Sequence, residues 1–399
     1  MNNLIIYSDL PLFNSVTAAG NRMTKYAKAI ASNNCRVFIV SNNSIPQSVS
    51  QKLIEFSQNC FFIVNSNNSR ISSWSFIRFI NRFAVSLGEK RTWLYYPSNC
   101  FMLDILSTVY LKYFRGEKVF IEVNERRLYY KNKSVFRNVP FVRLPEVFIK
   151  YLYTKCSMAV AEMFVPYYDG AVFISKNIES HFKNRMKRKK YVRIPILCEP
   201  ENQEYSSKEL KPGSVFKMAF SGRIHVQKEN LNLLFIALGM LKEEGYRFNL
   251  NLYGPIINRP YIKKLITENN ISLQVKYCGN IDYQILQNEL QNNHLLLLVR
   301  GKTRQNNFGF STKLSDYLKS GVPLLVTKVS DNGIYLKDLK NAFVINPDSE
   351  FEIFEKIKFI INNYNKYAPI VLMGANNLVN REFAYCNHGN KLLSLFFNN

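Results

Sequence analysis

Two cations follow a glycine at the end of a strand-like apolar run in the second half of the chain. Arg223 lies one residue and Lys228 six residues after Gly222, and an apolar stretch of helical period begins shortly afterwards. A glycine lets the backbone approach a ligand closely, and two cations beside a helix N-terminus attract an anion such as a diphosphate. The segment is therefore a candidate diphosphate site, although two solvated cations on a surface loop would leave the same pattern.

The stretch NNFGFSTKLSDYLKSGVPLLVT, residues 306–327, has the same character. Ser311 and Thr312 are suited to cap the start of a short helix, and Lys313 follows them directly. Free N–H groups, the helix dipole and the lysine would all favour an anion at one point. Asp316 comes one turn later, where its carboxylate could reach the hydroxyls of a ribose or pair with a lysine on the surface.

The strands and helices that must position these residues fall into two series. Short β-branched or aromatic runs alternate with stretches of helical period, which is typical of parallel sheets covered by helices on both faces. Gly321 and Pro323 are expected to end the helix of residues 306–327 and to start the next strand. The predicted strands are residues 4–8, 36–41, 61–65, 92–96, 118–123 and 170–175 in the first half, and 216–222, 248–254, 275–279, 295–299, 322–327 and 342–347 in the second.

A polar stretch with prolines and no apolar periodicity separates the two series, as a linker between domains does. The predicted domains are an amino-terminal Rossmann-like domain over 1–198, a linker over 199–214, a carboxyl-terminal Rossmann-like domain over 215–365, and a helical segment over 366–399 that can pack back on the first domain. Two such domains on one short linker should enclose a central cleft at the carboxyl ends of their sheets.

The order of these motifs resembles the carboxyl-terminal half of GT-B-fold glycosyltransferases, in particular the large retaining family 4, also called group 1. The resemblance runs from Phe216 to about Asn363 and rests on FSGRIHVQKENLNLL, LNLYGP, VKYCGNI, LLLLVRG, FGFSTKLSDYLKSGVPLLVT and NAFVINP. In the first half, residues 17–41 and 168–182 resemble the family's first loop and helix and its last strand and helix. The resemblance implies an α/β GT-B fold in which the domain over 1–198 binds the acceptor and the domain over 215–365 binds the nucleotide sugar. It also implies transfer of a sugar from a nucleotide diphosphate sugar to a glycan hydroxyl.

The resemblance also implies roles for the residues that match. Arg223 and Lys228 correspond to cations that hold the donor diphosphate and stabilise the leaving group, so they are predicted to be catalytic. Asp316 takes the place of the second glutamate of a Glu-x7-Glu pattern, which holds the ribose. The donor-binding residues implied are Gly20, Asn21 and Arg22 on a loop of the first domain, and Gly222, Gly254, Gly309, Phe310, Ser311, Thr312, Lys313 and Asp316 in the second.

The sequence departs from the family's pattern at the donor sugar. The first glutamate of the pattern falls at Phe308, and Asn306 or Asn307 could supply the polar contact instead. The stretch LYYPSNC, residues 94–100, lacks the histidine that the family often has near the sugar. An alternative function is therefore a catalytically impaired protein of the same fold that binds a nucleotide sugar or a glycan.

Glu125 is the candidate for the acceptor side. It follows the predicted strand 118–123, together with Glu122, and Arg126 and Arg127 come directly after it. A carboxylate here could hydrogen-bond an acceptor sugar or take the proton from its hydroxyl. An ion pair between Glu125 and the neighbouring arginines is the alternative.

The net charge of +24 is concentrated in the first half, where residues 1–198 hold 29 Lys and Arg against 11 Asp and Glu. This excess favours a polyanionic neighbour such as anionic lipid, although a generally basic surface would also explain it. Two stretches could contact a membrane, each with a simpler alternative: the aromatic helix 74–87, which could be a core helix, and the basic run 183–193, which could be a solvated helix end. We expect peripheral contact at the inner face of the cytoplasmic membrane, since no apolar run reaches the roughly 18 residues of a membrane span and no signal peptide is apparent.

Other classes of protein lack their signatures here. The seven cysteines are scattered and never form a Cys-x-x-Cys pair, and the four histidines lack metal-ligand spacing, so neither a disulfide framework nor a protein-bound metal or other cofactor is expected. No Gly-x-Gly-x-x-Gly follows a first strand, which argues against a nicotinamide dehydrogenase. Nucleic acid is not expected as a partner, because modules that read bases are absent.

Overall fold

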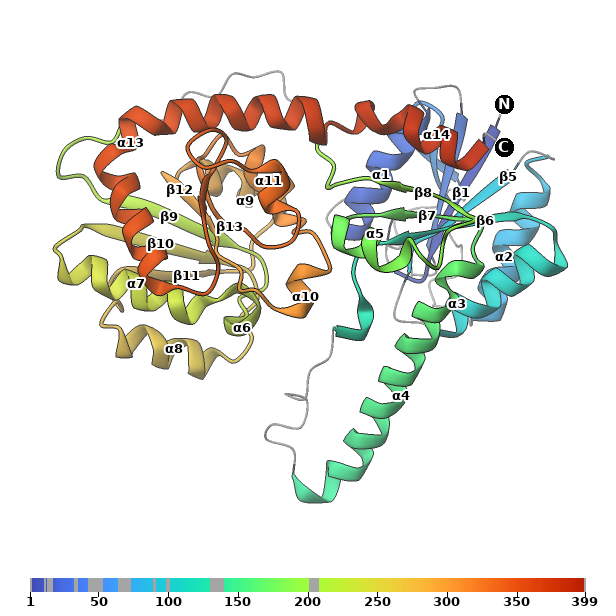
Figure 1. The fold of residues 1–399 in the computed structure, drawn as a ribbon, viewed down its shortest axis with the longest axis horizontal. Helices are drawn as coiled ribbons and strands as arrows, with labels where there is room; N and C mark the ends of the chain where they lie inside the picture. The colour runs from blue at the N-terminus through green and yellow to red at the C-terminus, as the bar shows by residue number, and fades with distance from the viewer. Residues whose placement is uncertain are drawn as a thin grey trace. The chain divides into compact units, whose positions relative to one another are not determined.

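The computed structural model describes residues 2–10, 12, 17–31, 35–41, 53–63, 73–88, 91–97, 101–129, 140–200 and 208–397. Its internal contacts divide the chain into two compact units, shown in Figure 1. Unit 1 comprises Met1–Leu197 together with Tyr385–Asn399, and unit 2 comprises Cys198–Ala384. The end of the chain therefore belongs to the same unit as its beginning.

Unit 1 is built on a mostly parallel sheet with the strand order β3-β4-β2-β1-β5-β6-β7-β8. Among the described strands, only the edge pair β3–β4 is antiparallel. The strands β3 and β8 were not predicted, and β8 forms from the last part of the basic run 183–193. The bounds are β1 Asn2–Ser8, β2 Cys35–Ser41, β3 Leu53–Ser57, β4 Cys60–Ile63, β5 Arg91–Tyr95, β6 Lys118–Val123, β7 Gly170–Phe173 and β8 Lys190–Arg193.

The helices of unit 1 include one from the end of the chain. Leu392, Leu395 and Phe396 of α14 lie in the unit 1 core with side chains of α1 and of the central strands. The bounds are α1 Ala18–Ala31, α2 Ser73–Val85, α3 Phe101–Thr108, the π-helix η1 Val109–Phe114, α4 Leu144–Phe164, α5 Lys176–Phe182 and α14 Gly389–Phe397, with 3-10 turns η2 Arg127–Tyr129, η4 Phe141–Arg143, η5 Val165–Tyr167 and η7 Tyr385–His388.

Helix α2 corresponds to the aromatic stretch 74–87. Phe76, Ile77 and Ile80 on its apolar side are buried in unit 1. The core alternative is therefore the one that the structure shows, and this apolar face cannot at the same time lie on a membrane. No described helix is both long and apolar enough to cross a bilayer.

Unit 2 is built on a parallel sheet with the order β11-β10-β9-β12-β13-β14. This is a doubly wound order, in which the direction of winding reverses between the first and fourth strands, here β9 and β12. Ligands of such sheets bind at this switch point, outside the carboxyl ends of the two strands. The bounds are β9 Phe216–Ser221, β10 Phe248–Tyr253, β11 Val275–Gly279, β12 Leu295–Leu298, β13 Leu324–Thr327 and β14 Phe343–Ile345.

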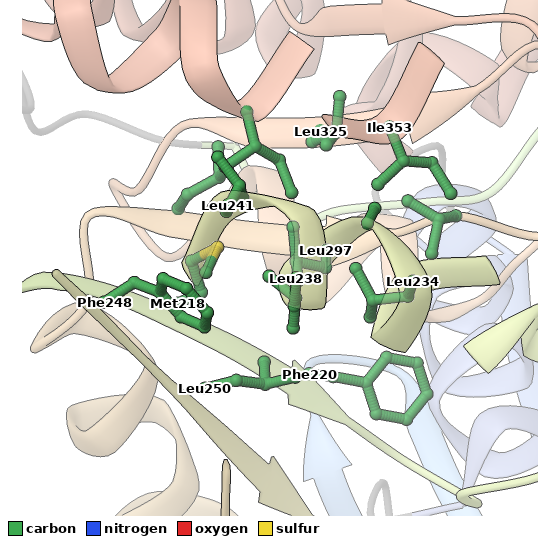
Figure 2. Close-up of a cluster of buried hydrophobic side chains, with 14 of the residues drawn as sticks. Met218, Phe220, Leu234, Leu238, Leu241, Phe248, Leu250, Leu297, Leu325 and Ile353 are labelled. Carbon is green, nitrogen blue, oxygen red and sulfur yellow. The ribbon is translucent and has the colours of Figure 1, made fainter. Parts of the chain in front are cut away.

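The core of unit 2 lies between this sheet and the helices that cover it. Figure 2 shows Leu234, Leu238 and Leu241 of α7 in one cluster with Phe220 and Leu250 of the sheet, all of them buried. The spacing of the three leucines puts them on one face of α7. The bounds are α6 Val226–Glu229, α7 Leu231–Glu243, α8 Arg259–Glu268, α9 Tyr283–Gln291, α10 Arg304–Asn307, α11 Lys313–Leu318, α12 Asn332–Tyr335, α13 Glu350–Leu378 and the π-helix η6 Val379–Phe383.

Candidate functional site

Three segments of unit 2 meet at the carboxyl ends of β9, β10 and β12. Gly222 directly follows β9 and has a φ of +114°, and Gly254 directly follows β10 with the same φ. A β-carbon on Gly254 would lie 2.4 Å from the carbonyl oxygen of Gly222, and one on Gly222 would lie 2.4 Å from Cε of Lys313. Both positions therefore require glycine, and the side chain of Lys313 crosses the backbone of Gly222.

A buried carboxylate organises the cations at this point. Glu229, the last residue of α6, accepts two hydrogen bonds from Arg300, from Nε at 3.3 Å and from Nη2 at 3.2 Å. Nζ of Lys313 lies 3.1 Å from Oε1 of the same glutamate and 4.0 Å from the centre of the Phe220 ring. Two cations thus share one anion, which leaves an excess of positive charge at the switch point of the sheet.

The protonation of this cluster reflects its burial. Burial alone would raise the pKa of the Glu229 carboxyl, but the attraction of Arg300 and Lys313 outweighs it and lowers that pKa to about 2. Burial lowers the pKa of the Lys313 ammonium to about 8, against the opposing attraction of Glu229. The glutamate is therefore ionised at neutral pH, and most of the lysine carries its proton.

Of the two cations predicted to be catalytic, Lys228 lies beside this cluster. Lys228 precedes Glu229 in α6, and its charge is close enough to contribute to the lowered pKa of Lys313. The side chain of Lys228 is half-buried, and that of Arg223 is exposed after Gly222. The backbone of Lys228 is held at both ends, because its N–H donates to Nδ1 of His225 and its carbonyl accepts from Asn306.

The stretch 306–327 reaches the cluster through α11, which begins at Lys313. The predicted side-chain cap is wrong, because Thr312 makes no capping hydrogen bond and the buried Oγ of Ser311 has no partner among the described residues. Instead, the hydroxyl of Tyr317 accepts from the N–H of Ser221 at 2.7 Å and so fixes α11 to the end of β9. After the helix, Gly321 adopts a φ of +68°, as the predicted left-handed turn requires.

Three other residues predicted to bind the donor, Gly309, Phe310 and Asp316, contact other parts of unit 2. The carbonyl of Gly309 accepts from Ser330, and the buried ring of Phe310 stacks on Tyr335, so Phe310 belongs to an aromatic cluster. Oδ1 of Asp316 accepts from the hydroxyl of Tyr283 on α9 at 3.0 Å. Asp316 is half-buried and lies on the helix that carries Lys313.

The side chain of Asn306, a candidate to replace the missing glutamate, is hydrogen-bonded to backbone carbonyls. Its Nδ2 donates to the carbonyls of Lys228 and Gly301, at 2.9 Å each, and joins the loop after β12 to α6. Its buried Oδ1 has no hydrogen-bond partner among the described residues. The neighbouring Phe308 follows α10 and is half-buried, so it is an aromatic side chain that stands where the family has an acid.

In unit 1 the three residues assigned to a loop lie in the first part of helix α1, which corrects the predicted local structure. Gly20 is buried and Asn21 is half-buried. Arg22 is buried and donates from Nε to Glu122 at 2.6 Å and from Nη2 to the carbonyl of Ile194 at 2.8 Å. Burial raises the pKa of Glu122, and Arg22 opposes that shift. The guanidinium therefore ties α1 to the strands of unit 1, while donor contact by these residues stays a prediction.

Glu125 lines a pocket of unit 1 next to the end of β6. The pocket is also lined by Arg126, Glu162 and Phe182. Arg126 pairs with Glu162, its Nη2 lying 2.6 Å from Oε1, and Nε2 of His181 lies 2.8 Å from the same oxygen. Glu125 lines the pocket beside this pair, and its role on the acceptor side stays a prediction.

Sequence reasoning missed three residues of the unit 2 site: Glu229, Arg300 and Tyr283. A signal was present for Arg300, which stands two residues after β12 and so at the switch point of the doubly wound order. No signal showed that Glu229 would turn inward to bind it, because the two residues are 71 positions apart. Among the described residues no group of three or more His, Cys, Asp or Glu could hold a metal ion.

Comparison with known proteins assigns a family to the part of the chain that contains this site. Residues 201–371 match the family model described as Glycosyl transferases group 1. This region is a group 1 glycosyltransferase domain. It includes Gly222, the Glu229 cluster and the whole of α11, so the geometry described above lies within the matched residues.

Solved structures extend the likeness of fold to the whole chain. A sucrose-phosphate synthase from Thermosynechococcus elongatus has a TM-score of 0.69 at 13% identity, covering 99% of this chain and 98% of that one. HepE from Anabaena in complex with UDP and glucose has 0.67 at 13%, covering 99% of both chains. The lipopolysaccharide outer core galactosyltransferase WaaB has 0.65 at 13%, also covering 99% of both.

These likenesses confirm the predicted GT-B fold with two Rossmann-like domains, and the group 1 domain confirms that the protein is a glycosyltransferase. The central cleft between the domains stays a prediction. None of the curated proteins compared matches the chain by sequence.

Proposed function

We propose that the protein transfers a sugar from a nucleotide diphosphate sugar to a hydroxyl of a lipid-linked glycan, in the synthesis of a cell-surface polysaccharide. The observation that carries the proposal is the cluster of Arg300 and Lys313 around Glu229 at the switch point of a group 1 domain. A diphosphate is the part of such a donor that needs positive charge and close approach of the backbone.

The cluster supports a role in bond breaking. As the bond from the sugar carbon to the diphosphate oxygen breaks, the leaving diphosphate gains negative charge, which fixed cations stabilise. Glu229 holds the ammonium of Lys313 beside Gly222 before any donor arrives, so little reorganisation is needed at the moment of reaction. Lys228 and Arg223 add charge from α6 and from the loop after β9, and the unpartnered Oγ of Ser311 can donate to a phosphate oxygen.

The other contacts of the donor and the transfer of the acceptor's proton complete the proposed reaction. We assign binding of the ribose hydroxyls to Asp316. We assign the donor contacts of unit 1 to Gly20 and Asn21. A phosphate oxygen of the donor accepts the acceptor's proton on the face where the new bond forms, so the configuration at the anomeric carbon is retained and no metal takes part. We assign Glu125 to the acceptor side, where it binds the acceptor sugar or takes the proton in place of the phosphate oxygen, since its side chain lines a pocket of unit 1.

The proposed location and donor follow from charge and from the similar structures. The excess of 29 cations over 11 acids in residues 1–198 supports contact with anionic lipid at the cytoplasmic face of the membrane, where a lipid-linked acceptor would be found. HepE was solved with UDP and glucose and also with UDP-glucose. UDP-sugars are therefore the first donors to test.

The decisive experiment is a screen of UDP-sugars with membrane lipid extracts as acceptor, followed by NMR of the anomeric coupling in the product. We expect transfer with retention, unaffected by EDTA, and at least about a hundredfold loss of rate in Lys228→Ala with an unchanged circular dichroism spectrum. Unchanged turnover in Lys228→Ala would remove the donor-site assignment. An inverted product would overturn the retaining mechanism, and inhibition by EDTA would overturn the metal-free one.

The surroundings of Phe308 favour a second candidate, a protein that binds a nucleotide sugar or glycan without transferring it. Where the family has an acid, this chain has a half-buried phenylalanine, and both N–H donors of nearby Asn306 are committed to backbone carbonyls. Calorimetry that detects donor binding, together with neither transfer nor donor hydrolysis over the whole screen, would establish this candidate in place of the first.

A further inference from the structure

Helix α4 carries an apolar face that no described residue of unit 1 covers. Every third or fourth residue along it is exposed and apolar, which puts these residues on one side of the helix. Among them, Ile149 is 67% exposed, Tyr153 64% and Met163 64%. We call this set the α4 stripe: Pro145, Ile149, Leu152, Tyr153, Cys156, Val160 and Met163, continued by Tyr167 in η5.

The stripe is not the side by which α4 packs on its own unit. Met158, Ala161 and Val165 are buried, and their positions in the helical repeat lie opposite the stripe. Only the second half of α4 is anchored in this way, and Figure 1 shows the first half extending away from the sheet of unit 1. An amphipathic surface helix normally turns its apolar side inward, so an outward apolar stripe about 30 Å long indicates a binding surface.

Two further features adjoin the carboxyl end of the stripe. Tyr113 and Phe114 of η1 are exposed, and the neighbouring Lys112 fastens η1 to this end by donating to the carbonyl of Tyr167 and to Asp169, at 2.7 Å each. Lys189 lies 3.9 Å from the same carboxylate. It belongs to a segment with no acidic residue that we call the cationic turn: Lys183, Arg185, Lys187, Arg188 and Lys189, with Lys190 at the start of β8.

The charges beside the stripe decide between its possible occupants. In a dimer with α4 helices packed antiparallel, each cationic turn would approach the start of the partner's α4, where Glu146 is the only acid of that helix's first turn. Six cations would then face one carboxylate, and the residues 1–198 around them are strongly basic. A bilayer with anionic headgroups supplies both an apolar layer for the stripe and negative charge for the turn.

We propose that unit 1 docks on an anionic membrane through the α4 stripe, with Tyr113 and Phe114 entering the interface and the cationic turn held by lipid headgroups. This inference rests on the proposed function, which places the protein at a membrane, and it names the surface that makes the contact. Docking itself does not require the transfer reaction. It replaces α2, whose apolar side is buried, as the helix that meets the membrane.

The test is sedimentation of the full chain with vesicles of phosphatidylcholine alone and of phosphatidylcholine with phosphatidylglycerol. The stripe variant is Ile149→Ser with Leu152→Ser, and its matched control is Leu273→Ser, an exposed leucine of unit 2 that is 91% accessible. The charge variant is Lys187→Glu with Arg188→Glu, and its matched control is Lys263→Glu with Lys276→Glu on the exposed surface of unit 2.

We expect the wild-type chain and both controls to bind the anionic vesicles. Each test variant should lose about tenfold or more in the vesicle partition coefficient, and 0.5 M salt should weaken wild-type binding because it screens the headgroups. Stripe variants that bind like the wild type, or a control that loses as much as its test variant, would overturn the proposal. So would a dimer, seen by light scattering, that dissociates in the stripe variant while no form of the protein binds vesicles.

A second readout separates this inference from the proposed function. Hydrolysis or transfer of the donor in detergent, without vesicles, should be equal in the wild type and the stripe variant, whereas Lys313→Met should lose it and still bind vesicles. Vesicle binding without any activity would count against the proposed reaction alone, and activity without vesicle binding would count against the docking surface alone.

Discussion

The ammonium of Lys313 lies 3.1 Å from the carboxylate of Glu229, and the two side chains are only 15% and 3% exposed. An exposed pair of this kind contributes little to stability, whereas a buried one is strongly coupled to its surroundings. Arg300 shares the same carboxylate, so either cation can be removed without leaving Glu229 unpaired. This arrangement makes the roles of the three residues separable by mutation.

Lys313→Met is expected to remove activity while keeping the fold. Arg300 still neutralises Glu229, and the unbranched methionine fits the space beside Gly222, so the midpoint of thermal unfolding should change little. The value of kcat/KM for transfer should fall by about a hundredfold or more, because a cation at the leaving diphosphate is lost. The control is Lys264→Met, a lysine paired with Glu268 on the surface of α8. Equal activity of the two variants would contradict the assignment of Lys313 to the diphosphate.

Glu229→Gln is expected to lower the free energy of unfolding. Arg300 and Lys313 then face each other without the anion that they share, and breaking a buried ion pair of this kind costs about 3 kcal/mol in the free energy of unfolding. Urea denaturation measures the loss, with Glu268→Gln on α8 as the control for an exposed pair. A Glu229→Gln variant as stable as that control would show that the buried cluster contributes nothing to the fold.

The pH dependence of stability follows from the two shifted pKa values. The pKa of Glu229 falls from an ordinary 4.5 to about 2, so its contribution is complete above pH 4.5 and is lost as the pH falls toward 2. The pKa of Lys313 falls from 10.5 to about 8, so the unfolded chain holds that proton longer and stability rises between pH 8 and 10.5. The stability gap between wild type and Glu229→Gln, measured by urea denaturation, should shrink below pH 4.5. A gap that is constant down to pH 2 would contradict the low pKa of Glu229.

The strands of both sheets could be predicted because most are short apolar runs between polar turns. Those of unit 2 begin and end within two residues of their predicted bounds. The strands β3 and β8 escaped prediction for a physical reason, since edge strands such as LIEFS and KYVR carry charged side chains that do not interrupt pairing on a solvated edge. Helical periodicity likewise marked α2 as amphipathic but could not say that its apolar side faces the core.

The site was predictable only where its parts are neighbours in sequence. Gly222, Lys228 and Lys313 could be found because each stands in a short motif at the end of a strand or the start of a helix. The pairing of Glu229 with Arg300 depends on β9 lying next to β12, which is a property of strand order and not of local pattern. The inward turn of Arg22 depends in the same way on Glu122, a residue 100 positions away in β6.

The glycines at the ends of β9 and β10 should differ in how well they tolerate a methyl group. Gly254→Ala places its Cβ 2.4 Å from a backbone oxygen, which cannot move easily, whereas in Gly222→Ala the close contact is the end of the flexible Lys313 side chain. Gly222 and Gly254 both have a φ of +114°. The control is Gly245, which also has a positive φ, of +83°, but a β-carbon there would meet no atom within 4 Å. We expect losses in unfolding free energy of about 1 kcal/mol for Gly245→Ala and more for Gly254→Ala, measured in urea.

For Gly222→Ala we expect a larger effect on transfer than on stability, because Lys313 must leave its place beside the diphosphate. Activity and urea denaturation measured on the same preparations separate the two effects. A Gly222→Ala variant that keeps full activity would show that the position of Lys313 over this glycine is not needed for catalysis.

Helix α14 makes unit 1 dependent on the end of the chain. Leu392 is fully buried in the unit 1 core, and Nζ of Lys391 donates to the carbonyl of Arg193 in β8 at 3.1 Å. Leu392→Ala should therefore lower the free energy of unfolding by about 2–5 kcal/mol, the range for a leucine truncated in a core. The control is Leu273→Ala, a leucine 91% exposed in unit 2, which should have almost no effect. Urea denaturation followed by tryptophan fluorescence reports on the unit concerned, because both tryptophans of the chain, Trp74 and Trp93, belong to unit 1. If Leu392→Ala unfolds at the same urea concentration as Leu273→Ala, α14 does not belong to the core of unit 1.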